Sequence, residues 1–266
     1  MNKIYFVTGS QDLYGEETLR QAANDSTVIS GFLNEKLSDI AEVVFQPVVK
    51  TADEAEDICV RASSDKECIG VIMWMHTFSP AKMWIKALKA LKKPMLHLHT
   101  QFNEKLPYDS IDMDFMNLNQ SAHGDREFGF ICTRLGIKRE VVAGYYQHDD
   151  VTEKIRRFAH AASAVSFSRT LRVAMLGNNM RDVAVTDGDR VESEIRFGWN
   201  VNYYGIGDVA EIADGVTESE IDAKMAEYTE KYTMATDNIA AVREQAKYEV
   251  ALDKFIAREK IGAFTD

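Results

Sequence analysis

Short apolar runs alternate with longer amphipathic segments through the first 150 residues, and this alternation constrains the fold more than any other feature of the sequence. Such runs are typical of strands that are buried on both faces of a parallel sheet. We expect five strands, at residues 4–7, 42–49, 68–75, 94–99 and 141–146. The chain is therefore predicted to begin with an α/β domain built on a doubly wound, flavodoxin-like parallel sheet.

The segments between these runs carry helix signals. Residues 16–36 place apolar side chains mostly three or four positions apart, which predicts one long helix. Thr51 is followed three residues later by Glu54, the pattern of a capping box at a helix start. Pro80 suits the first position of a helix expected over residues 81–91. Right-handed crossovers would then bring the loops that follow the strands to one edge of the sheet.

A small, serine-rich stretch at residues 161–170 predicts a domain boundary. We place an N-terminal α/β domain with sugar-facing loops at residues 1–168 and a second, smaller α/β domain at residues 169–266. The elements expected in the second domain are strands at residues 171–176 and 194–204 and helices at about residues 217–233 and 237–261.

The net charge of the chain limits the classes of partner that it is expected to bind. With 42 acidic and 31 basic residues the net charge is −11, whereas nucleic acids and anionic membranes need basic surface, so neither partner is expected. No run reaches the ~18 apolar residues that a membrane span needs, and the start lacks the apolar core of a secretory signal. Cys59, Cys68 and Cys132 are widely spaced and odd in number. They favour reduced thiols in the cytoplasm, with a reactive cysteine as the alternative.

The loops after the expected strands are the candidate binding regions, because open α/β sheets bind ligands beyond the carboxyl ends of their strands. Residues 9–15, 76–80 and 100–103 hold amide, hydroxyl and aromatic groups with few charges. Amides and hydroxyls bind sugar hydroxyls, and aromatic rings cover sugar C–H faces. A neutral sugar is therefore one candidate ligand, although ordinary polar loops have a similar composition. A nucleotide is disfavoured because the glycine-rich phosphate-binding patterns are absent.

Two further patterns have both a binding and a structural interpretation. His97 and His99 lie two positions apart on an expected strand, so they face one side and could reach one metal. The alternatives are a buried, hydrogen-bonded pair or two side chains that line the carboxyl edge of the sheet. Residues 110–124, taken as one helix, place Met116, Gln120 and His123 on one face. That face is compatible with a ligand contact or with the polar stripe of an ordinary amphipathic helix, and the charged residues 124–127 are typical of a solvated turn or a subunit contact.

Five blocks of the sequence, in order, resemble the L-arabinose isomerase family, and the resemblance covers essentially the whole chain. The blocks are Gly9-Ser-Gln-Asp-Leu-Tyr-Gly-Glu-Glu-Thr-Leu-Arg20, Met75-His-Thr-Phe-Ser-Pro-Ala-Lys-Met-Trp84, His99-Thr-Gln-Phe-Asn103, residues 109–130 and residues 177–189. The resemblance implies an aldose–ketose isomerase of sugar catabolism that converts L-arabinose to L-ribulose and D-galactose to D-tagatose. It also implies a divalent metal, typically Mn²⁺, and a homo-oligomer whose site lies between subunits.

Seven residues match the sugar-contacting positions of the family. They are Gln11, Leu13, Tyr14, Phe78, Gln120, His123 and Met180. The resemblance thus favours a binding role for Gln120 and His123, and it gives His97 and His99 no metal role. In the family a glutamate pair moves a proton through an ene-diol beside the metal.

The two glutamates and two histidines that bind the family's metal lie in the second half of chains nearly twice this long. None of these ligands is present in this sequence, so no catalytic or metal-ligating residue is assigned. Three hypotheses follow: a short isomerase with a metal site of its own, part of a longer isomerase, or a non-catalytic sugar-binding module.

Overall fold

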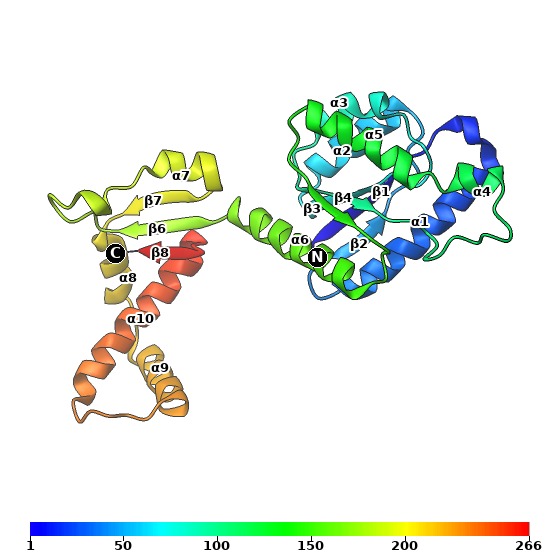
Figure 1. The fold of residues 1–266 in the computed structure, drawn as a ribbon. Helices are drawn as coiled ribbons and strands as arrows, with labels where there is room; N and C mark the ends of the chain where they lie inside the picture. The colour runs from blue at the N-terminus through cyan, green and yellow to red at the C-terminus, as the bar shows by residue number, and fades with distance from the viewer. Residues whose placement is uncertain (266) are drawn as a thin grey trace. The chain divides into compact units, whose positions relative to one another are not determined.

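The computed structural model describes residues 1–265 and divides into two compact units, Met1–Ser166 and Phe167–Asp266. Each unit is built on a parallel sheet of its own (Figure 1). The predicted α/β fold class, a larger parallel sheet followed by a smaller one, is therefore confirmed. No helix within residues 1–265 is long and apolar enough to cross a membrane.

The first unit contains a five-stranded parallel sheet. Its strands are β1 (Lys3–Thr8), β2 (Glu42–Phe45), β3 (Cys68–Trp74), β4 (Met95–His99) and β5 (Glu140–Ala143). The strand order is β2-β1-β3-β4-β5, and every pairing is parallel. This is the order of a flavodoxin-like doubly wound sheet, whose topological switch point lies between β1 and β3.

Helices cover both faces of this sheet. Helices α1 (Gly15–Leu37) and α6 (Asp149–Ser168) pack against one face, whereas α2 (Ala52–Ser64), α3 (Ile85–Ala90) and α5 (Ser121–Arg134) pack against the other. Alternate side chains of strand β1 pack into the two hydrophobic cores on either side of the sheet. Ile4 and Phe6 enter the first core, and Tyr5 and Val7 enter the second. Successive side chains of a strand point to opposite faces, so a strand buried on both faces is apolar throughout.

The local helix signals are borne out with small adjustments. Thr51 and Glu54 form the predicted capping box at the start of α2. The helix expected over residues 81–91 begins as the 3₁₀ turn η2 (Ala81–Trp84) and continues as α3, with Pro80 at the position that precedes the turn.

The single helix expected over residues 110–124 is wrong. The chain forms α4 (Met113–Leu118), leaves helical geometry at Asn119 and Gln120, and starts again as α5. The Asn119 side-chain amide donates to the carbonyl oxygen of Phe115 at 3.0 Å. Asparagine side chains compete in this way with backbone hydrogen bonds and favour helix ends.

The second unit contains a smaller parallel sheet. Its strands are β6 (Arg172–Leu176), β7 (Asn200–Tyr204) and β8 (Ala263–Thr265), in the order β7-β6-β8. Helices α8 (Ile206–Asp214) and α10 (Ile239–Glu259) supply the apolar side chains that pack on this sheet. Helices α9 (Glu218–Lys231) and α10 confirm the two helices predicted near the end of the chain, whereas α8 and β8 were not predicted.

The strand expected over residues 194–204 is correct only in its second half. Residues 190–197 form helix α7 (Arg190–Phe197) instead. The Asp189 carboxylate accepts the backbone N–H of Glu192 at 2.9 Å, which caps the start of this helix. Gly198 ends it with a left-handed φ of 78°. These two capping residues outweigh the apolar spacing that suggested a longer strand.

Candidate functional site

The loops after β1 and β3 meet at the switch point of the first sheet, where the sequence predicted binding residues. The side-chain amide of Gln11 donates to the backbone carbonyl of Phe78 at 3.1 Å, so the two loops are joined directly. Gly9 makes this contact possible. A Cβ at position 9 would lie 2.4 Å from the Met75 sulfur and 2.8 Å from the Ser79 Oγ.

Buried polar side chains support these loops from below. The hydroxyl of Thr77 donates to Ser10 Oγ at 2.7 Å, and His76 is hydrogen-bonded to Asp25 of α1 at 2.8 Å. The His76 ring is fully buried and stacks on Trp74, with ring centroids 4.2 Å apart. Buried polar groups that find partners specify one arrangement of the chain, so this network holds the loops in a defined position.

Phe78 meets the first turn of α5 through His123. The two rings stack with centroids 4.6 Å apart and an interplanar angle of 28°. Gly124 allows the close approach, because a Cβ there would lie 2.8 Å from the carbonyl oxygen of Thr77. The structure thus brings together Gln11, Phe78 and His123, three of the residues predicted from the sequence.

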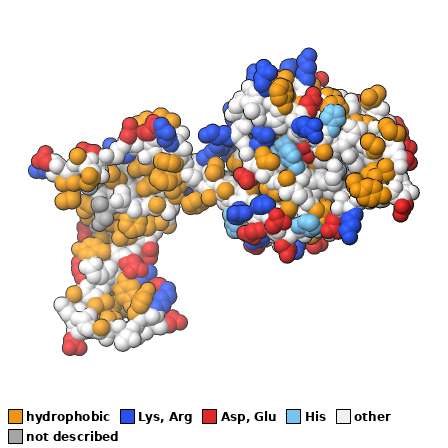
Figure 2. Space-filling view, viewed as in Figure 1, with side chains coloured by type: hydrophobic (Ala, Val, Ile, Leu, Met, Phe, Trp, Pro, Cys, Tyr) orange, Lys and Arg blue, Asp and Glu red, His pale blue; other side chains and the backbone are white. Residues whose placement is uncertain are grey.

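Gln120 lies beside this cluster and lines a hollow of about 480 Å³ together with His123. Gln101 also lines the hollow, and its side-chain oxygen is buried with no hydrogen-bond partner among the described residues. Exposed apolar side chains border the hollow around α4, where Figure 2 shows orange side chains gathered at the edge of the first unit. They are Leu106, Ile111, Met113 and Met116. The hollow therefore has largely apolar walls, and the unpartnered oxygen of Gln101 is buried beside it.

Leu13 and Tyr14 lie on the 3₁₀ turn η1 (Asp12–Tyr14) that follows the Gln11 loop. The Leu13 side chain is 84% exposed, and Tyr14 is partly exposed. Among residues 1–265 neither side chain forms a hydrogen bond or ring contact with Gln120 or His123, and neither lines the hollow, so the structure places both on the same loop as Gln11 without joining them to the hollow.

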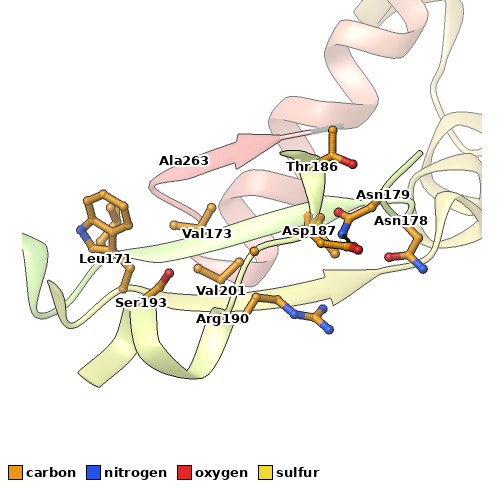
Figure 3. A pocket seen from close by; sticks show the side chains of 13 residues that line it. Leu171, Val173, Asn178, Asn179, Thr186, Asp187, Arg190, Ser193, Val201 and Ala263 are labelled. Atoms are coloured by element: carbon orange, nitrogen blue, oxygen red, sulfur yellow. Dashed lines mark hydrogen bonds between the residues drawn. The ribbon is translucent and has the colours of Figure 1, made fainter. Parts of the chain in front are cut away.

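Met180 belongs to the second unit, where it follows β6 and is 70% exposed. The same unit holds a hollow of about 640 Å³ over one face of its sheet (Figure 3). Val173 and Val201 form its apolar floor, and Asn179 and Asp187 form a hydrogen-bonded pair at its rim. Met180 itself is not among the residues that line this hollow.

His97 and His99 belong to a hydrogen-bonded chain that the sequence did not reveal as a whole. His97 Nε2 lies 2.8 Å from Asp125 Oδ1, and His99 Nε2 lies 3.1 Å from His97 Nδ1. Burial lowers the pKa of His97 to about 3 and raises the pKa of Asp125 to about 7. The buried, hydrogen-bonded interpretation of the histidine pair is the one that the structure favours. The spacing of Ser121, Asp125 and Phe128 along one helix face could have indicated that Asp125 is buried.

The donor set of the described residues does not fit the divalent metal that the family resemblance implies. No group of three or more His, Cys, Asp or Glu side chains in residues 1–265 is placed to hold a metal ion. His97 uses both ring nitrogens within its hydrogen-bonded chain. We therefore derive no chemical step through a metal in this chain.

Comparisons with known proteins agree along the whole chain. Residues 1–170 match the family model of the L-arabinose isomerase N-terminal domain, and residues 172–266 match that of the central domain. The L-arabinose isomerases of Geobacillus thermodenitrificans and Clostridium beijerinckii are each 48% identical to the chain, and that of Thermotoga petrophila is 46% identical. Each alignment covers 99% of this chain but 53–54% of the relative, so the chain spans about half the length of these relatives.

Proposed function

Because the chain belongs to the L-arabinose isomerase family, we propose that it forms the sugar-binding part of an aldose–ketose isomerase of arabinose catabolism. The observation that carries this proposal is the cluster of Gln11, Phe78 and His123 at the switch point of the first sheet. Open α/β sheets bind ligands at this place. The sugars proposed are L-arabinose, converted to L-ribulose, and D-galactose, converted to D-tagatose.

The chemistry of the adjoining hollow supports a neutral sugar. The buried oxygen of Gln101 has no hydrogen-bond partner among the described residues, so it could accept a hydrogen bond from a sugar hydroxyl if the side chain turned into the hollow. The amide of Gln120 supplies both a donor and an acceptor. The Phe78 ring lies outside the lining of the hollow but stacks on His123, which lines it, and offers an apolar face for C–H groups. We propose Gln11, Leu13, Tyr14, Phe78, Gln120, His123 and Met180 as the sugar-binding residues.

Isomerisation requires a proton to move between neighbouring carbons of the sugar, and we propose that the groups for this step, together with Mn²⁺, come from outside this chain. The proposal is supported by the donor set, which does not fit a metal, and by the relatives, which are nearly twice as long. A non-catalytic sugar-binding module is the second candidate function, favoured by the same donor set.

We further propose that the chain acts in the cytoplasm as part of a homo-oligomer. The three buried thiols without disulfides support a reducing compartment. The exposed apolar side chains around α4 support a subunit contact, because such patches on proteins often mark interaction sites.

Calorimetry with L-arabinose tests the proposed binding site. Tyr14→Ala and Gln120→Ala should each weaken the affinity by about tenfold or more, since one lost contact is worth ~1–3 kcal/mol. The matched controls are Tyr248→Ala and Gln245→Ala, both on the exposed surface of α10. Unchanged affinity in both site variants would refute the proposed binding residues.

Turnover of L-arabinose tests the proposal that this chain binds the sugar while the groups for proton transfer come from outside it. The chain is first treated with a chelator and then assayed with and without Mn²⁺, alone and mixed with a separately produced second half of a relative. We expect turnover only in the mixture with Mn²⁺. Metal-dependent turnover by the chain alone would contradict the proposal, and sugar binding without turnover under every condition would favour the binding module.

A further inference from the structure

Asp125 joins three elements beneath the candidate site. It lies on α5, and its carboxylate accepts the backbone N–H of Met75, just after β3, at 3.1 Å. It also accepts the hydroxyl of Ser121, in the first turn of α5, at 2.6 Å. His97 of β4 is its third partner, at 2.8 Å. The side chain of Asp125 is 1% exposed, so these contacts are made away from water.

This junction links the chain segments that carry Phe78 and His123. Met75 lies three residues before Phe78, and Ser121 lies two residues before His123, so Asp125 holds together the two segments whose rings stack. A second carboxylate, that of Glu127, makes a similar link between α5 and the backbone N–H of Ala81 at 3.0 Å. Within residues 1–265 Glu127 forms no hydrogen bond or ion pair with a histidine, so it is a suitable control.

The hydrogen bonds determine where the protons lie. When Asp125 is ionised it can only accept, so His97 donates from Nε2. Neutral His97 then has a bare Nδ1, which must accept from His99 Nε2. His99 is left with a bare Nδ1, and its side chain lines a hollow of about 360 Å³ that also contacts Gln101 and Arg126.

A proton that arrives at His99 can pass along this chain without leaving a charge on either ring. It binds His99 Nδ1 while the Nε2 proton of His99 moves to His97 Nδ1. The Nε2 proton of His97 then moves to Asp125, whose carboxylate becomes a carboxylic acid. One proton enters and one is stored. The protonated oxygen is a weaker acceptor for the N–H of Met75.

We propose that Asp125 is a positioning residue for Phe78 and His123, and that one proton, taken up at His99 and passed through His97, releases its hold on them. The effect on sugar binding rests on the proposed function, whereas the relay does not. At high pH the ionised Asp125 accepts hydrogen bonds and so links α5 to the loop after β3. At low pH the protonated Asp125 donates a hydrogen bond to His97 instead. The stacked rings then separate.

Other charged groups surround the relay and act on it at every pH. Arg139, which precedes β5, disfavours a positive charge on both histidines, and His76 faces Asp125 from the side of β3. Arg126 of α5 lines the same hollow as His99. Burial is the largest cause of the raised pKa of Asp125, which places the proton uptake near neutral pH.

Ring-nitrogen NMR of the whole chain between pH 8.5 and 5 tests the relay. We expect His97 and His99 to carry their protons on Nε2 at high pH and on Nδ1 at low pH, and to stay neutral throughout. The carboxyl carbon of Asp125 should shift at the same midpoint, and contacts between the Phe78 and His123 rings should weaken with it. Asp125→Asn should abolish this joint transition, whereas the matched carboxylate-to-amide change Glu127→Gln should retain it.

His99→Gln provides a second test that leaves Asp125 in place. The Gln amide can donate to His97 Nδ1, so His97 should keep its proton on Nε2 over the whole range. An imidazolium at either histidine, or a joint transition that survives in both Asp125→Asn and His99→Gln, would overturn the relay. Rings that stay stacked through the transition would overturn the positioning role.

Calorimetry with L-arabinose separates this inference from the proposed function. If the protonated form does not bind, the affinity should fall by about tenfold for each pH unit below the midpoint in the wild type, and less in Asp125→Asn. Affinity that is independent of pH, with the relay intact, would also overturn the positioning role. Absence of sugar binding at every pH would refute the proposed function and leave the NMR tests of the relay unaffected.

Discussion

Replacing Asp125 by Asn should make the stability of the first unit depend on pH through His97. Burial lowers the pKa of His97 from 6.5 to about 3, so its contribution to stability is present above pH 6.5 and is lost as the pH falls towards 3. Burial raises the pKa of Asp125 from 3.8 to about 7, so its contribution is present below pH 3.8 and is lost as the pH rises towards 7. The two dependences oppose each other.

Between about pH 4 and 6.5 the wild-type pair is expected to be insensitive to pH. The unfolded chain carries one proton on His97, and the folded chain carries one proton on Asp125, so folding neither takes up nor releases a proton at this pair. Asp125→Asn removes the second group. The free energy of unfolding of the variant should then fall, relative to the wild type, by about 1.4 kcal/mol for each unit by which the pH is lowered. Between pH 6.5 and 4.5 the difference amounts to about 3 kcal/mol.

Urea unfolding at pH 6.5, 5.5 and 4.5 measures this difference. The fluorescence of Trp74 and Trp84, both fully buried in the first unit, reports the transition in a Trp199→Phe background. Glu127→Gln is the control and should follow the wild type. Equal pH dependence in the wild type and Asp125→Asn would refute the argument that the two buried groups compensate each other.

Two further predictions concern glycine and cysteine. Gly198→Ala should destabilise the second unit by about 1–3 kcal/mol in thermal unfolding, because Gly198 has a φ of +78° and an added Cβ would lie 2.7 Å from the Cα of Arg169; Gly215→Ala, where φ is negative, should have a smaller effect. Cys59, Cys68 and Cys132 should react with a thiol reagent at pH 8 no faster than the chain unfolds, because all three are buried and burial raises the pKa of Cys59 to about 12. Rapid modification of the folded chain would contradict the latter prediction.

The predictable parts of the fold are those in which local and tertiary preferences agree. Strand β3 is apolar throughout because it is buried on both faces, and the capping box at Thr51 is a local hydrogen-bond pattern. The errors arise where a few polar or glycine residues outweigh apolar spacing. Asp189 and Gly198 turn half of an expected strand into α7, and Asn119 divides an expected helix.

Some features of the candidate site could likewise be predicted from the sequence, and others could not. The loops that hold Gln11 and Phe78 could be predicted because parallel strands bring their carboxyl ends to one edge of a sheet. The partners of Asp125 could not, because Met75, His97 and Ser121 come from three separate segments of the chain. Helical spacing could have indicated that Asp125 is buried, but its hydrogen-bond partners become visible only in the folded chain.

The sequence by itself determined the five strands of the first sheet, the loops at the switch point and the resemblance to a sugar isomerase family, because periodicity, capping and motif spacing are local properties. The tertiary structure alone decided that Phe78 stacks on His123 and that His97 and His99 are hydrogen-bonded to each other rather than arranged around a metal. It also decided that the Asp125 carboxylate is hydrogen-bonded to His97. These features depend on which distant segments meet in a water-free interior, where a polar group must find its partner among whatever the packing brings near.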